Sequence, residues 1–139
     1  NNTFRALIGT EQMAVIDRLS SERRQVAQAF GLRNLPSSEE WVDVHAGAER
    51  GEYSRPVPNR DAAQTLLRDG VIGSLAPLLS AAKLTGIDVP VTLSMVTLAS
   101  TILGSDVAAA GRRLDTIGIV HTDIDSARRA MDNIAMGMR

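Results

Sequence analysis

A single acidic residue, Asp69, stands directly before two helical segments that carry almost no charge. A carboxylate at the mouth of a buried helix pair can serve as a general acid or base, so residues 66–118 are the part of the sequence that most suggests chemistry. Such catalysis also needs a partner group and a substrate site, so this segment forms at most half of an active site. Asp69-Gly70 has a structural interpretation as well, because Asp before Gly is common where a turn breaks a helix.

The remaining side chains exclude several kinds of site. The chain has no cysteine, which rules out disulfides, thiolate metal sites and cysteine nucleophiles. No glycine-rich loop follows a predicted strand, so the chain lacks a dinucleotide-binding fingerprint. No cluster of acidic and histidine residues shows metal-ligand spacing, and we interpret the isolated His45 and His121 as surface or structural residues. Arg112 and Arg113 could address an anionic cofactor or a partner domain, although arginines on helices are mostly solvated.

Size and composition indicate one soluble globular domain over residues 1–139. The chain has 44% hydrophobic and 22% charged residues, and a chain of this length buries about two thirds of its unfolded surface. A formal net charge of −1 gives no electrostatic attraction to nucleic acid or to an anionic membrane. The uncharged run at residues 89–104 is too short to span a membrane and is rich in serine and threonine, so we expect a core helix there. We expect a cytoplasmic protein with no nucleic-acid or membrane partner.

Apolar periodicity predicts two helices in the first part of the chain. Apolar residues recur at helical spacing across residues 11–30, and Gly31 stands where that helix would end. Ser37 or Ser38 can cap a second helix, which precedes an irregular connection at residues 47–60. The predicted inner faces comprise Met13, Ile16, Leu19, Val26, Ala27 and Phe30 in the first helix and Trp41, Val42 and His45 in the second.

The second part of the sequence predicts further helices, each with start and end signals. A short helix from Asn59 or Asp61 through Leu67 is broken or bent at Asp69-Gly70, and Pro77 fits the first turn of the next helix or kinks it. The helix after Pro77 should end at Gly86, and the next, capped by Asp88 before Pro90, should run to Leu103 and end at Gly104. Ser105 or Asp106 can cap a helix over residues 107–117, which Gly118 would end. A last helix should start at Thr122 or Asp123 and run through Ile134, with one apolar face formed by Ile124, Ala127, Met131 and Ile134. The expected fold is an all-α, compact bundle of about six or seven helices.

The order of these segments resembles a known family. Three segments carry this resemblance, in the same order as in the family: MAVIDRLSSERRQVAQAFGL, LLRDGVIGSLAPLLSAAKLTGIDVPVTLSMVTLAS and GRRLDTIG. The chain is similar to the C-terminal helical domain of the octopine/nopaline dehydrogenases, which are NAD(P)-dependent opine dehydrogenases. The resemblance covers most of the chain and implies a fold like the C-terminal domain of 6-phosphogluconate dehydrogenase. It also implies that an N-terminal Rossmann domain, absent from this chain, binds most of the NAD or NADP, so that the isolated 139 residues are inactive.

The resemblance further implies an activity and its residues. Opine dehydrogenases condense an amino acid with a 2-oxo acid and reduce the resulting imine. The family's catalytic aspartate precedes a Gly, Leu and Pro signature, which here places Asp69 as the catalytic candidate before Gly73, Leu75 and Pro77. Its histidine partner lies upstream of the long helix in the family, where this chain has none.

Substrate-binding candidates lie just before the aspartate. The family tends to place an arginine there, where a guanidinium could pair with a substrate carboxylate, whereas this sequence has Gln64 at that spacing. Arg60 lies one turn earlier and Arg68 is adjacent to Asp69, so either could substitute. The implied partners are the Rossmann domain, the amino acid and 2-oxo acid substrates, and a second copy in a homodimer.

Two other functions stay open. The chain could belong to a related NAD(P)-dependent dehydrogenase that acts on a 2-oxo or hydroxy acid without an amine. It could also be a non-enzymatic helical interaction or dimerisation module, in which Asp69 is only a turn residue. Dimerisation is compatible with all of these functions, because the long amphipathic helix at residues 11–30 offers a second face to a partner.

Overall fold

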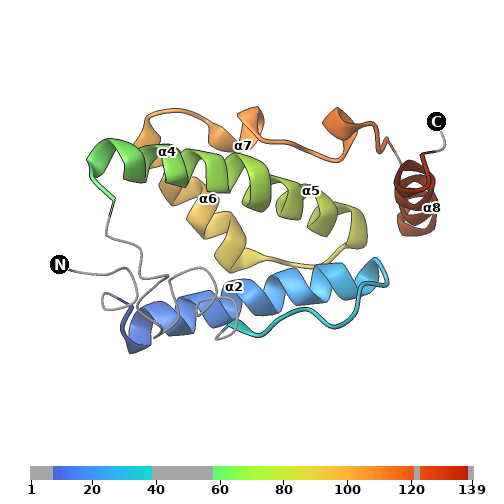
Figure 1. Cartoon of the computed structure of the whole chain (residues 1–139), viewed down its shortest axis with the longest axis horizontal. Helices are drawn as coiled ribbons and strands as arrows, with labels where there is room; N and C mark the ends of the chain where they lie inside the picture. The colour runs from blue at the N-terminus through green and yellow to red at the C-terminus, as the bar shows by residue number, and fades with distance from the viewer. Residues whose placement is uncertain (1–7, 39–57, 121–122, 138–139) are drawn as a thin grey trace.

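A computed structural model describes residues 8–38, 58–120 and 123–137 of the chain. These residues contain helices and connecting segments and no strand, so the predicted all-α class is confirmed. In Figure 1, α2 lies along one side of the bundle, α4 and α5 form a second layer, and α6 lies between them. Beyond Ser38, the second predicted helix with Trp41, Val42 and His45 lies outside the described residues, as does most of the connection at 47–60.

The first long helix, α2 (Thr10–Ala29), forms where the apolar periodicity predicted it. Gly31 follows it with a φ of 83°, the left-handed conformation that ends a helix without a Cβ penalty. Val26 is buried and the other predicted inner positions are half-buried, since α2 packs against α5 and α6. The acidic Glu22 is buried on the same face, which the apolar pattern did not predict.

Of the break or bend predicted at Asp69-Gly70, the break does not occur. The helix α4 (Arg60–Gly70), capped by the side chain of Asn59, continues through the π-helical turn η1 (Val71–Leu75) into α5 (Ala76–Thr85). We call these three elements the α4–α5 rod. The helix persists because Val71 is buried against α6 and α7, and this packing outweighs the local preference of Asp-Gly for a turn.

The π turn leaves one carbonyl without its helical partner. The N–H of Ala76 donates to the carbonyl oxygen of Val71, five residues back. In this register the next donor would be Pro77, which has no N–H to give to Ile72. The N–H of Arg112 donates to the Ile72 oxygen instead, at 3.2 Å, so a distant segment satisfies the carbonyl. Pro77 stands in the first turn of α5, as predicted.

The helix α6 (Pro90–Leu103) ends at Gly104, as predicted, but its predicted cap is wrong. Asp88 is exposed, and the N-cap residue, Val89, makes no side-chain hydrogen bond. The carboxylate of Glu22 on α2 accepts instead from the N–H of Val91 at 2.8 Å and from the N–H and hydroxyl of Thr92 at 2.8 and 2.7 Å. A buried carboxylate thus replaces the local cap, because it satisfies two unpaired N–H groups at the positive end of α6.

A single helix over residues 107–117 does not form. Asp106 caps α7 (Val107–Ala110), as predicted, but the chain becomes extended at Gly111 and turns again only in the 3₁₀ helix η2 (Asp115–Ile117). The physical reason is the contact of Gly111 with the rod, where a Cβ would overlap that of Ala76. Gly118, with a φ of 90°, ends η2 at the predicted position.

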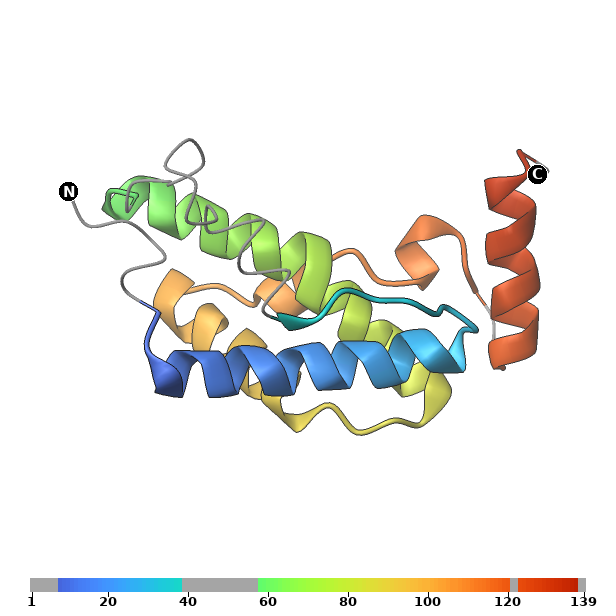
Figure 2. The same cartoon turned by 60° about the horizontal axis from the view of Figure 1, so that its bottom comes forward.

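The last helix, α8 (Ile124–Ala135), lies across one end of the bundle in Figures 1 and 2. Asp123 caps it and Ala127 is fully buried. Ala127 shares a cluster with Leu114 and Ile119, beside Met131, while Ile134 of the predicted apolar face is exposed. The predicted start and end of this helix are confirmed, and its apolar face only in part.

The buried residues are mostly small. One cluster joins the rod to α6 and α7, a second joins α2 to α5, and a third anchors α8, so the helices approach closely around valine and alanine. Among the described helices, none is by itself long and apolar enough to cross a membrane, although α6 followed by residues 107–117 passes by length and composition as a pair bent by 104°.

Candidate functional site

The predicted substrate-binding residues share one face of α4. Arg60, Gln64 and Arg68 follow one another at intervals of four residues, and Asp69 lies beside Arg68 in the last turn. Arg60, Arg68 and Asp69 are exposed, and Gln64 is half-buried. Arg60, Gln64 and Arg68 form what we call the α4 face, and Asp69 lies about 100° further around the helix from Arg68. Within the described part of the chain none of these four side chains makes a hydrogen bond or ion pair.

The surroundings of Asp69 leave it accessible. No residue of α4 is buried, and Leu66, on the turn before Asp69, is 62% exposed. His45 and His121, the two histidines of the sequence, both lie outside the described residues. A second acid or base for chemistry at Asp69 would therefore have to come from elsewhere in the protein.

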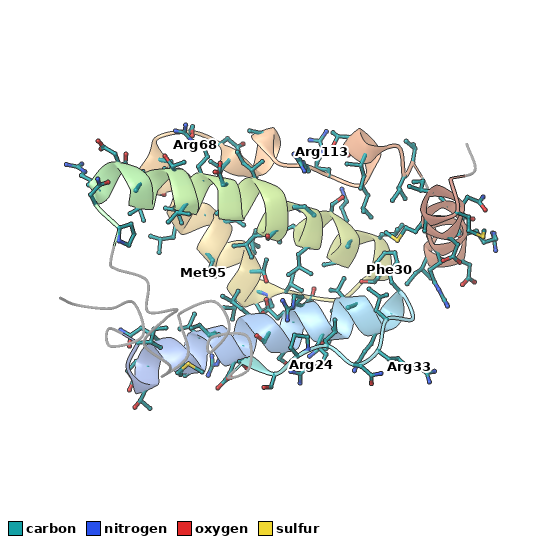
Figure 3. The ribbon with its side chains drawn as sticks, in the orientation of Figure 1. Arg24, Phe30, Arg33, Arg68, Met95 and Arg113 are labelled. Carbon is teal, nitrogen blue, oxygen red and sulfur yellow. The ribbon has the colours of Figure 1, made fainter. Side chains whose placement is uncertain are left out.

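A hollow of about 730 Å³ lies on another part of the bundle. We call it the α5 hollow, because α5 forms one wall and the segment from Ala108 to Val120 forms the other. None of the α4 face residues lines it. Figure 3 places Arg68 on α4 and Arg113 on the segment after α7. The lining residues are Ala76, Leu79, Ser80, Lys83, Leu84, Ala108, Arg113, Leu114, Asp115, Ile119 and Val120.

Three contacts fix the outer wall of the hollow to the rod. The N–H of Arg112 donates to the Ile72 oxygen, Gly111 packs on Ala76, and the N–H of Leu114 donates to Oγ of Ser80 at 3.1 Å. The three rod positions, 72, 76 and 80, are four residues apart and so lie on one side of the helix. The segment after α7 therefore follows one side of the rod and arrives beside α5 with Arg113 in a defined position.

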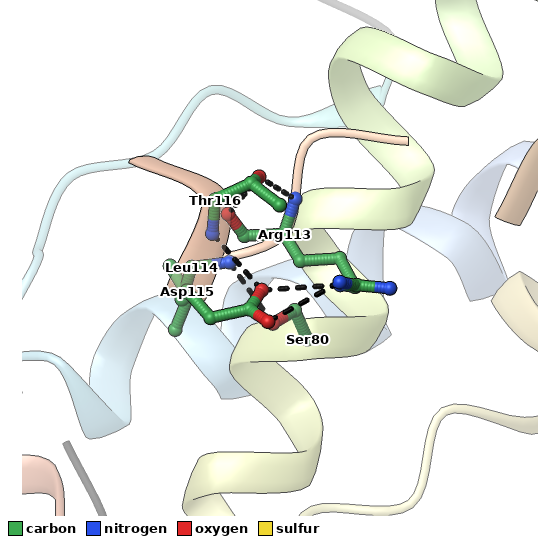
Figure 4. Close-up of polar contacts among 5 residues, drawn as sticks. All are labelled: Ser80, Arg113, Leu114, Asp115 and Thr116. Atoms are coloured by element: carbon green, nitrogen blue, oxygen red, sulfur yellow. Dashed lines mark hydrogen bonds and ion pairs between the residues drawn. The ribbon is translucent and has the colours of Figure 1, made fainter. Parts of the chain in front are cut away.

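An ion pair orients Arg113 in the α5 hollow. Its Nε and Nη2 atoms donate to the two carboxylate oxygens of Asp115 at 3.1 and 3.2 Å, and Figure 4 shows this paired geometry. The N–H of Thr116 also donates to Asp115, at 3.0 Å. The Arg113 hydrogen bonds lower the pKa of the Asp115 carboxyl below 3.8. The two side chains are 47% and 54% exposed, so the pair meets solvent at the edge of the hollow.

Sequence reasoning did not find this hollow. Lys83 and Arg113 come from elements 30 positions apart in the numbering, and the prediction placed Arg113 on a helix rather than on an extended segment. The available signal was that Lys83 is the sole lysine of the sequence, on an otherwise uncharged helix.

The chain was also compared with known proteins. No protein-family model and no curated protein matches the chain. Among the described residues, no group of three or more acidic or histidine side chains could hold a metal ion.

Proposed function

We propose that this chain is the C-terminal helical domain of an opine dehydrogenase-like oxidoreductase. The whole enzyme would condense an amino acid with a 2-oxo acid and reduce the imine with NADH or NADPH. Support comes from the order of the segments in the sequence and from the all-helical fold. The described residues contain no strand followed by a glycine-rich turn, so they do not fit a dinucleotide site. An upstream Rossmann domain would bind the cofactor.

The strongest support for this function is the exposure of the α4 face and of Asp69. A helix with two arginines, a glutamine and an aspartate in reach of solvent, and with no partner for any of them in the described residues, is available to a substrate and to a second domain. In this role Arg60 or Arg68 binds a substrate carboxylate through its guanidinium. Asp69 accepts from, and orients, an imidazole contributed by another part of the protein.

The π turn next to Asp69 adds support. Single π turns inside α-helices are often found at functional sites, and η1 begins two residues after Asp69. Because a π turn inserts one extra residue into a helix, it changes the direction in which α4 presents its side chains relative to α5.

The test uses the full-length natural protein. Oxidation of NADH and of NADPH is followed with amino acids alone, 2-oxo acids alone and both together, with the 139-residue chain as the control. We expect consumption only when both organic substrates are present, and none with the control. Consumption without an amine would instead identify a related 2-oxo acid or hydroxy acid dehydrogenase, and no consumption with any pair would contradict both.

One observation favours a second candidate function, a helical interaction module. Leu93, Leu98 and Ile102 on the uncharged helix α6 are 56%, 53% and 54% exposed. Leu98 and Ile102 lie one turn apart on the same side of the helix, and exposed apolar residues that lie side by side are typical of a surface that packs against a partner. Under this alternative Asp69 has no role beyond its helix, and replacing it would leave partner binding intact.

A further inference from the structure

We propose that the α5 hollow binds a small monocarboxylate that carries an apolar group. This site is separate from the α4 face, and the inference does not rest on the proposed dehydrogenase activity. Lys83 approaches the hollow from α5 and Arg113 from the facing segment, so two cationic side chains from different elements line one space. A carboxylate between them would be attracted by both charges.

Arg113 is already oriented for such a ligand. Asp115 occupies its Nε and Nη2 atoms, and the third guanidinium nitrogen, Nη1, points away from Asp115 in Figure 4. Main-chain contacts hold the segment as well, since the N–H of Arg113 donates to Oγ1 of Thr116 at 2.9 Å. A guanidinium whose position is fixed before binding loses less freedom when it engages an anion.

The charges of the hollow favour a monoanion. Lys83 and Arg113 each contribute one positive charge and Asp115 one negative charge, which leaves a single positive charge in excess. One carboxylate balances that excess, whereas a compact dianion would be repelled by Asp115 at close range. The hydroxyl of Ser80 accepts from the N–H of Leu114, and its own hydrogen can be donated to the ligand.

The rest of the lining is apolar. Leu79, Leu84 and Ile119 lie along the hollow, and Ile119 belongs to the buried cluster that anchors α8. A volume of about 730 Å³ falls within the range of small-molecule sites, which combine mostly apolar walls with a few polar groups that fix orientation. A ligand with its carboxylate at Lys83 and Arg113 would therefore place an apolar group against these walls.

The uniqueness of Lys83 gives a direct measurement. Labelling the 139-residue chain with lysine that carries ¹³C at Cε yields one side-chain NMR signal, that of Lys83. We titrate this chain with 4-phenylbutyrate as the probe, with 4-phenylbutanol as its uncharged analogue and with inorganic phosphate as a compact anion. We expect a saturable shift of the Lys83 signal and of the Ile119 methyl signals with 4-phenylbutyrate, and clearly weaker binding of the other two.

Variants separate the proposed contacts from general charge effects. Because ion pairs that are half exposed to solvent are weak, Lys83→Gln and Arg113→Gln are each expected to raise the Kd about three- to fivefold, now read from the Ile119 methyl signals. Arg113→Lys keeps the charge and should recover part of the affinity. Arg18→Gln, on the exposed side of α2, removes the same charge from a residue that does not line the hollow and should leave the Kd unchanged.

Four results would overturn the inference. They are the absence of a saturable shift with 4-phenylbutyrate, equal binding of phosphate, equal Kd values for Arg113→Gln and Arg18→Gln, and a Lys83 signal that moves with protein concentration alone. The last result would show that a second copy of the chain covers the hollow. Unchanged signals of the buried Ala127 in each variant would confirm that the fold is intact.

Discussion

The main-chain N–H of Arg112 donates to the carbonyl oxygen of Ile72 at 3.2 Å. Pro77 would be the helical donor to this oxygen, but proline has no N–H. The π register and the missing N–H of proline together leave this acceptor open, and a segment 40 positions later in the numbering fills it. Since an unpaired carbonyl inside a protein costs free energy, the π turn and the path of the chain after α7 stabilise each other.

Gly111→Ala should destabilise the fold, because the added Cβ would overlap that of Ala76. The backbone of Gly111, with a φ of −71°, is accessible to alanine, so only the steric overlap is tested. We expect a loss of about 1–3 kcal/mol in the free energy of unfolding, measured by urea denaturation.

Gly73→Ala is the matched control in the same region. A Cβ at Gly73 meets no atom within 4 Å, and alanine favours a helix over glycine by about 0.5–1 kcal/mol. We expect this variant to be at least as stable as the original chain.

The double variant Gly111→Ala/Ala76→Gly should recover part of the loss, because it removes the overlap but places a glycine in α5. Equal stability of Gly111→Ala and the original chain would show that the packing is not as described.

Glu22→Ala should weaken the docking of α2 on α6. The carboxylate accepts three hydrogen bonds, two of them from the unpaired N–H groups at the start of α6, and Glu22 is only 7% exposed. We expect a loss of about 2–4 kcal/mol, since the buried N–H of Thr92 and the part-buried N–H of Val91 both lose their acceptor. Thr92→Val removes only the hydroxyl donor and should cost less. Amide exchange at Val91 and Thr92 provides the measurement, and unchanged protection in Glu22→Ala would refute the cap.

Asp115 should titrate with a pKa below that of an ordinary aspartate. Its hydrogen bonds with Arg113 hold the pKa of the carboxyl below 3.8, so the ion pair is fully formed above the unfolded-state value. As the pH falls through the folded-state pKa, the carboxylate is protonated and this contribution to stability is lost. NMR titration should show the low pKa, and Arg113→Gln should raise it towards 3.8; an identical titration curve in that variant would rule out the pair as the cause.

Local signals allowed most helix boundaries to be predicted. Asn59, Asp106 and Asp123 cap the helices that follow them, and each accepts from an N–H three residues later. Gly86 and Gly104 end helices in the left-handed conformation. In these cases one residue and its immediate neighbours determine the geometry, so the sequence alone contains the information.

Three of the predictions that differ from the structure involve contacts between distant segments. Asp69-Gly70 stays helical because the next residues are buried against α6 and α7. Asp88 is not the cap of α6, since Glu22 reaches its first turn from 69 and 70 positions away. Gly111 ends α7 through its contact with Ala76. Propensity and spacing do not report which distant side chains compete for a helix end.

Of the two candidate sites, the sequence predicted the one within a single helix and missed the one formed by distant segments. Arg60, Gln64 and Arg68 could be placed on one helix face because their spacing lies within a single helix. The α5 hollow could not be predicted, because Lys83 and Arg113 come to line the same space only when the segment after α7 packs against the α4–α5 rod. Their catalytic or binding roles stay predictions.

The most direct measurement of the dehydrogenase proposal is kcat for Asp69→Asn in the full-length natural protein, at saturating amino acid, 2-oxo acid and NAD(P)H. Asp17→Asn, on the exposed side of α2, is the control, since it removes the same charge from a different helix. If Asp69 orients the acid or base, kcat should fall by about 100-fold or more, with unchanged thermal stability, while Asp17→Asn keeps its activity. Equal kcat values for the two variants would contradict the assignment and leave Asp69 as an ordinary helix residue.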